Sequence, residues 1–157
     1  MQITNFRNEV ILICNLQSSI FNLQFEIFKN IKMEHLIIDK TDDTPAIDFN
    51  PGTKELKISG RSLPEDVTTF YEPVMNWLDE LEESDGGHYQ FIVNLEYFNT
   101  ASSKLILDIL MRFEDIHTGG SVTIEIIWNF DKRDTDMEEA AEEYSELVEV
   151  PFSIVGI

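Results

Sequence analysis

Two periodicities of apolar residues run along the chain after residue 33. Between Ser121 and Phe130, apolar residues occupy every second position, which is the spacing of a strand that buries one face. Pro51 and Gly52 separate two further short apolar runs and predict the turn of a β-hairpin. The complete set of predicted strands is 35–39, 46–50, 55–60, 89–97, 121–130 and 151–155.

Segments with helical spacing of apolar residues separate these predicted strands. Helices are expected from about 66 to 83, from about 101 to 116 and from 136 to 148, with glycine pairs ending the first two. Alternating strands and helices favour parallel pairing through right-handed crossovers. The pattern therefore predicts one α/β domain with a mixed, mostly parallel sheet, an N-terminal hairpin and flanking helices that cover the sheet.

Residues 1–32 differ from the rest in charge. They hold three basic and two acidic residues, a net charge of +1, which leaves −20 for residues 33–157. Their apolar run VILIC is too short to span a membrane, and no cleavage site of a signal peptide follows it. We expect 1–32 to be an extension preceding a natural start at Met33; the alternative is an accessory helix packed on the domain.

Composition limits the classes of partner. The chain has 157 residues, a formal charge of −19 and a pI of about 4.2. This acidic field disfavours non-specific binding to nucleic acid or to an anionic membrane, and it favours a protein or a cationic surface as the partner. The single cysteine, Cys14, excludes an internal disulfide and a cysteine-based zinc site, which favours a reducing compartment such as the cytoplasm.

No residue pattern indicates catalysis. His35, His88 and His117 occur singly, without the spacing of metal ligands, and the run DKRDTD at 131–136 lacks the glycine and terminal glutamate of a calcium loop. Phosphate-binding glycine loops and serine-nucleophile elbows are also missing from the sequence. We therefore expect no catalytic residue, metal or cofactor. A small α/β enzyme or ligand-binding module with an unrecognised site remains the alternative.

Hydroxyl side chains gather where the predicted strand 89–97 leads into the next helix. The stretch LEYFNTASSKLILDIL, residues 95–110, holds Thr100, Ser102 and Ser103 at this junction. Asn99 or Thr100 can cap the helix. The loops after the carboxyl ends of strands form the usual working edge of an open α/β sheet, and a helix amino terminus accommodates an anion. The hydroxyls are therefore either a cap or a chemical switch.

The helix that follows these hydroxyls offers a candidate docking surface. Lys104 and Arg112 fall on its predicted solvated face, together with Asp108. Leu107 and Met111 flank the core stripe, where they either contact a neighbouring helix or form an exposed apolar patch for a partner. The predicted partner interface is Asn99, Ser102, Ser103, Lys104, Leu107 and Met111.

The stretch 95–110 resembles the signature of the SiaC-type bacterial regulatory phosphoproteins, an apolar strand followed by a YxN-T-x-S-S turn and a helix ending in DIL. Other parts agree in order along residues 33–157, and residues 1–32 lie outside the resemblance. They are TPAIDF at 44–49, ISGRSLPED at 58–66, the WL of the first helix, and WNFDKRD at 128–134 followed by an acidic helix.

This resemblance implies a fold like that of the anti-sigma-factor antagonists (STAS-like) and a role without catalysis. Proteins of this type are phosphorylated on the threonine of the turn by a dedicated kinase and dephosphorylated by a PP2C-type phosphatase. In characterised systems the unmodified form binds and activates a diguanylate cyclase. Matched residue by residue, the phosphoacceptor is Thr100, with Ala101 standing where a serine is common.

Overall fold

The computed structural model describes residues 16–20 and 33–157. The chain divides into two compact units, residues 1–32 and residues 33–157. In the first unit, residues 16–20 are helical, with Leu16 54% and Ile20 55% exposed. The other residues of that unit, including Cys14, lie outside the described residues, so its assignment as an extension stays a prediction.

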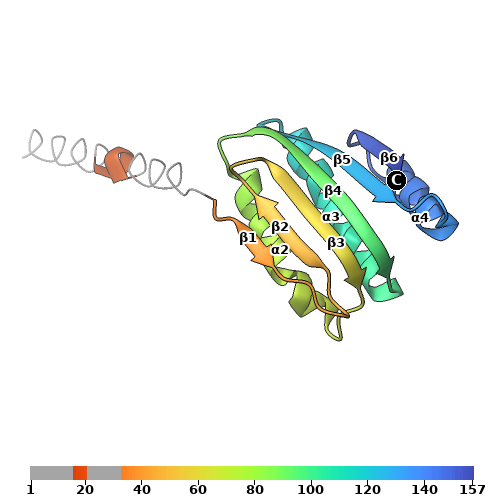
Figure 1. The fold of residues 1–157 in the computed structure, drawn as a ribbon. Helices are drawn as coiled ribbons and strands as arrows, with labels where there is room; N and C mark the ends of the chain where they lie inside the picture. Colours follow the sequence, from red (N-terminus) through yellow and green to blue (C-terminus); the bar gives the residue numbers. More distant parts are fainter. Residues whose placement is uncertain (1–15, 21–32) are drawn as a thin grey trace, which may run out of the picture. The chain divides into compact units, whose positions relative to one another are not determined.

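Residues 33–157 are built on a six-stranded sheet whose spatial order is the order of the sequence, β1 to β6 (Figure 1). The pairs β1–β2 and β2–β3 are antiparallel, and the three later pairs are parallel. This confirms the predicted mixed, mostly parallel sheet with an N-terminal hairpin. The strands are β1 (Leu36–Ile38), β2 (Ala46–Asn50), β3 (Glu55–Ser62), β4 (Gly87–Phe98), β5 (Val122–Phe130) and β6 (Phe152–Gly156).

Each parallel connection contains a helix whose first turn is closed by a side chain. The helices are α2 (Val67–Glu82), α3 (Thr100–Gly119) and α4 (Thr135–Leu147). Their N-caps are Asp66, Asn99 and Asp134, each accepting a hydrogen bond from a backbone N–H three residues on. The helix α3 continues past the predicted end at 116 and stops at Gly120, which has a left-handed conformation with φ 95°.

The three helices lie on one face of the sheet, behind the strands in Figure 1. Consecutive right-handed crossovers between neighbouring strands place every helix on the same side. The core therefore forms between that face and the helices, with Phe49, Phe91 and Trp128 from the strands at 2% exposure or less. The expectation that helices cover the sheet holds for this face alone.

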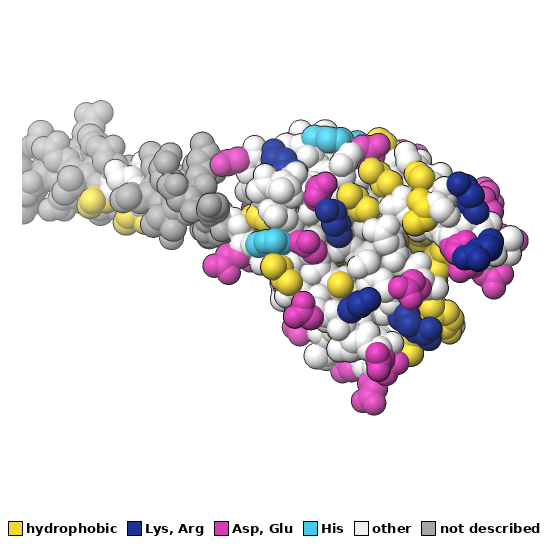
Figure 2. Space-filling model, viewed as in Figure 1, with side chains coloured by type: hydrophobic (Ala, Val, Ile, Leu, Met, Phe, Trp, Pro, Cys, Tyr) yellow, Lys and Arg dark blue, Asp and Glu magenta, His cyan; other side chains and the backbone are white. Residues whose placement is uncertain are grey.

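The opposite face of the sheet carries polar side chains. Gln90 and Glu125 hydrogen-bond across β4 and β5, and Asn94 and Asn129 do the same further along. Figure 2 shows this face, where acidic, basic and hydrophobic side chains are interspersed. Within residues 33–157, no helix covers this face of the sheet.

We expect a chain shortened to begin at Met33 to keep a single cooperative thermal transition. The reason is that residues 33–157 form their own compact unit, with Met33 buried and Trp77 Nε1 donating to the carbonyl of Glu34 at 2.8 Å. Calorimetry of the full and shortened chains measures this. Loss of cooperative unfolding in the shortened chain would contradict it.

Candidate functional site

Thr100 lies at the carboxyl edge of the sheet, where β4 ends and α3 begins. Asn99 has an extended backbone (φ −85°, ψ 172°) and caps the helix: its Oδ1 accepts from Ser102 N at 2.8 Å. The carbonyl of Asn99 accepts from Ser103 N at 2.9 Å. Of the two capping residues left open by the sequence, the cap is therefore Asn99, and the Thr100 hydroxyl is not needed for it.

The three hydroxyls of the turn differ sharply in their surroundings. Ser102 is fully buried, and Ser103 is half-buried and donates to the carbonyl of Thr100 at 2.9 Å. Thr100 is exposed, and its hydroxyl makes no hydrogen bond to the described residues. Among these three side chains, Thr100 alone presents an exposed and unengaged oxygen.

A chain of buried hydroxyls holds the turn from below. Ser62, at the end of β3, donates from Oγ to Ser102 Oγ at 2.9 Å and lies 2.7 Å from the Tyr71 hydroxyl of α2. The carbonyl of Ser62 also accepts from Asn99 N at 3.1 Å. Burial raises the pKa of Tyr71 to about 12, so its hydroxyl stays protonated at neutral pH. Ser62 and Ser102 are the buried polar residues of the described core.

A second tyrosine holds the turn from the side of α4. The Tyr144 hydroxyl donates to the carbonyl of Ser103 at 3.0 Å. Its ring lies 5.3 Å from Trp128 and 6.2 Å from Phe98, measured between ring centroids. Burial raises the pKa of Tyr144 to about 12. The first turn of α3 is thus fixed by hydrogen bonds from β3 and α4, and through Ser62 by α2.

The sequence reading missed Ser62, Tyr71 and Tyr144 as supports of this turn. Ser62 had a signal, because it falls on the buried positions of β3 in alternation with Leu56 and Ile58. A hydroxyl at such a position needs a buried partner. The identity of that partner depends on the fold, since Ser102 is 40 residues away along the chain.

The rest of the predicted interface divides between surface and core. Lys104 is exposed and Met111 is 50% exposed, whereas Leu107 is partly buried against the core. Ser102 has no exposed surface, so it supports the turn from inside and does not belong to a contact surface. Arg112, predicted on the solvated face of the helix, forms ion pairs instead. Its guanidinium joins α3 to α2 by pairing with Asp79 at 2.9 Å and with Glu82.

The first turn of α3 is suited to an anion. The leading N–H groups of a helix have no intrahelical acceptor and carry partial positive charge. Asn99 occupies the N–H groups of Ser102 and Ser103, which leaves those of Thr100 and Ala101 without an acceptor from the cap. No acidic residue lies in this turn, and Lys104 follows Thr100 by one turn. A phosphate on Thr100 is therefore compatible with the fold.

A cavity of about 300 Å³ opens at the same edge, between the ends of β4 and β5 and the start of α4. Its polar lining includes Asn94 and Asn129, which hydrogen-bond to each other at 2.8 Å, and Asp134, which is engaged in capping α4. Asp131 accepts from the backbone N–H of Arg133 and Asp134 caps α4, so residues 131–136 form a turn and a helix cap. Within residues 16–20 and 33–157, no acidic, histidine or cysteine cluster could hold a metal ion, and no helix could span a membrane.

The cap predicts the effects of two substitutions. Asn99→Ala should lower the free energy of unfolding by about 1 kcal/mol, because Ser102 N loses its acceptor. Thr100→Val should change it by less than about 0.5 kcal/mol, since the Thr100 side chain is exposed. Denaturant titration of both variants beside the parent chain measures this, and a larger loss for Thr100→Val would show that Thr100 is the cap.

The tyrosine supports predict a loss of stability at alkaline pH. Tyr71 and Tyr144 have pKa values of about 12 in the folded protein, against 10.0 for the free side chain. Below pH 10 the two tyrosine hydroxyls are protonated in both the folded and the unfolded chain. Above pH 10 they lose their protons in the unfolded chain and keep them in the folded chain, so the free energy of unfolding falls as the pH rises. Tyr71→Phe should show a smaller fall between pH 10 and 12. An equal fall in the variant would contradict this assignment.

Comparisons with known proteins show relatives of this chain in sequence and in fold. A sequence profile described as SiaC family regulatory phosphoprotein matches residues 38–157. The chain is 32% identical over 122 residues to an uncharacterized protein of Pseudomonas aeruginosa strain UCBPP-PA14, which covers 78% of this chain and 96% of that protein. The similarity of this chain's fold to that of the anti-sigma-factor antagonists stays a prediction.

Two solved structures are similar over most of the chain. The first is apo-SiaC from Pseudomonas aeruginosa, with a TM-score of 0.73 and 33% identity over 79% of this chain and 100% of that chain. The second is the diguanylate cyclase SiaD in complex with its activator SiaC from the same organism, with a TM-score of 0.72 and 32% identity over 78% of this chain and 99% of that chain. The protein therefore belongs to the SiaC family of regulatory phosphoproteins.

Proposed function

We propose that this protein is a non-catalytic switch in a bacterial partner-switching system of the cytoplasm, with Thr100 as its phosphorylation site. A cognate kinase modifies Thr100, a PP2C-type phosphatase restores it, and the unmodified form binds an effector such as a diguanylate cyclase. The supporting observation is the accessibility of Thr100, whose hydroxyl is exposed and unengaged while Ser102 is buried and Ser103 is hydrogen-bonded. The complex of SiaD with its activator SiaC supports a cyclase as the class of effector.

Charge gives the switch its physical basis. Phosphorylation adds about −1.5 to −2 charges at neutral pH, and the start of α3 tolerates them. A partner seated over Thr100 in its unmodified form must either desolvate the new dianion or provide a basic group for it. Because the supports of the turn are internal, the modification changes the surface and leaves the fold in place. One covalent change thus exchanges partners.

Phosphosite mapping tests the assignment. Protein isolated from its native cell should carry phosphate on Thr100, found by intact-mass and fragment-mass analysis. Thr100→Val should remove the modification, because valine keeps the branched shape and lacks the hydroxyl.

Ser103→Ala is the matched control, because Ser103 is a neighbouring hydroxyl that is partly exposed. It should leave phosphorylation unchanged. Normal modification of Thr100→Val, or phosphate located on Ser103, would show that the site is wrong.

A further inference from the structure

The carboxyl ends of β3 and β4 contain an irregularity that presents two side chains together. The register of the pair shifts between Gly60 and Arg61, so that Gly60 lies opposite Leu95 and Arg61 opposite Tyr97. Gly60 has φ 95°, a left-handed conformation that glycine adopts without strain. Bulges of this kind redirect side chains at the edge of a sheet. Here the Arg61 guanidinium lies over the Tyr97 ring, 5.3 Å from its centroid.

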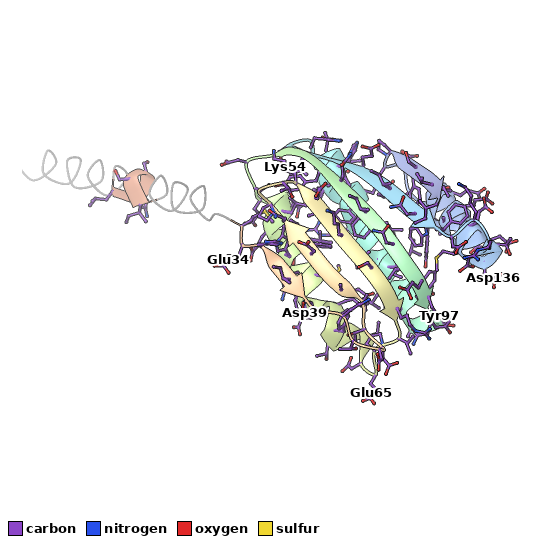
Figure 3. The ribbon with its side chains drawn as sticks, viewed as in Figure 1. Glu34, Asp39, Lys54, Glu65, Tyr97 and Asp136 are labelled. Carbon is purple, nitrogen blue, oxygen red and sulfur yellow. The ribbon has the colours of Figure 1, made fainter. Side chains whose placement is uncertain are left out.

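Both members of this pair face solvent. Tyr97 is 48% exposed and Arg61 is exposed, and Figure 3 labels Tyr97 at the end of β4 that leads into α3. Arg61 has no ion pair with a described residue, although acidic residues far outnumber basic ones. Lys57 of the same strand, by contrast, is paired with Glu55 at 2.7 Å. The guanidinium of Arg61 is therefore available to an external carboxylate.

The pair shares its edge with Thr100. Tyr97 precedes Thr100 by three residues, and Ser62, which follows Arg61, accepts from Asn99 N at 3.1 Å. Arg61 is thus linked to the Thr100 turn by the backbone hydrogen bond of Ser62, and Tyr97 is linked to it by the chain itself. Tyrosine and arginine are also enriched among the few residues that provide most of the energy of protein interfaces.

We propose that Arg61 and Tyr97 form the docking point of the effector, which presents a carboxylate to the guanidinium and an apolar side chain to the exposed ring. This inference rests on the proposed function. Local charge complementarity favours it, because the exposed Arg61 guanidinium has no ion pair with a described residue and attracts a carboxylate at short range. A phosphate on Thr100 is an anion at the same edge, so it repels the effector's carboxylate.

The unphosphorylated protein is first used to capture its effector from native-cell extract. The effector is then identified by mass spectrometry and purified. Calorimetry then measures its affinity for the full chain. Arg61→Gln and Tyr97→Ala should each weaken binding about tenfold. Arg61→Gln should also flatten the dependence of affinity on salt, because one ionic contact is lost.

Two control variants separate this site from general surface effects. Lys57→Gln removes a cation of β3 that is already paired, and Ile37→Ala removes a side chain that is 61% exposed on the distant strand β1. Each should change the affinity less than about twofold. Melting temperatures of all variants verify that they fold.

The outcomes separate the two proposals. If Arg61→Gln and Tyr97→Ala bind like the parent while phosphorylation still releases the effector, the docking point is wrong and the switch stands. The docking point is equally wrong if these variants impair only phosphorylation by a native-cell extract. If phosphorylation leaves the affinity unchanged, or the parent retains no effector, the proposed function itself fails.

Discussion

The hydrogen bond between Ser62 and Ser102, buried beneath the start of α3, fixes the turn that holds Thr100, the proposed phosphorylation site. It joins the end of β3 to the first turn of α3, and Tyr71 extends it to α2. A polar network in an apolar core is costly unless every member is paired, and once paired it specifies a unique arrangement. Because Ser102 faces inward and Asn99 caps the helix, the neighbouring Thr100 is turned to solvent with its hydroxyl unengaged.

This separation of support from surface would allow the proposed phosphorylation of Thr100 to change the surface charge while the fold is kept. Tyr71 and Tyr144 hold the turn from opposite sides through a hydroxyl and a carbonyl that the modification does not touch. The same edge of the sheet offers an exposed aromatic ring and a guanidinium that has no ion pair with a described residue. The proposed phosphate on Thr100 would therefore change the surface that a partner contacts while the internal contacts persist.

The sequence predicted the local structure better than the contacts that position Thr100. Periodicity located α2 and α4 to within a residue or two, and predicted the buried face of β5, because those patterns are local. The end of α3 was missed by three residues, since Gly119 is tolerated in its last turn and Gly120 forms the actual stop. The burial of Ser102 could not be read from the sequence, because its partner Ser62 is 40 residues distant. The open face of the sheet likewise follows from strand order, which periodicity does not encode.

The most direct test of this account compares one effector with two forms of the same chain, differing only by a phosphate on Thr100 installed as encoded phosphothreonine. Calorimetry measures both affinities, and thermal melting measures both stabilities. We expect the phosphate to weaken effector binding at least about tenfold, which corresponds to about 1.4 kcal/mol, while the melting temperature stays the same or rises. Equal affinities for the two forms would contradict it, and so would loss of affinity that arises only because the phosphorylated chain unfolds.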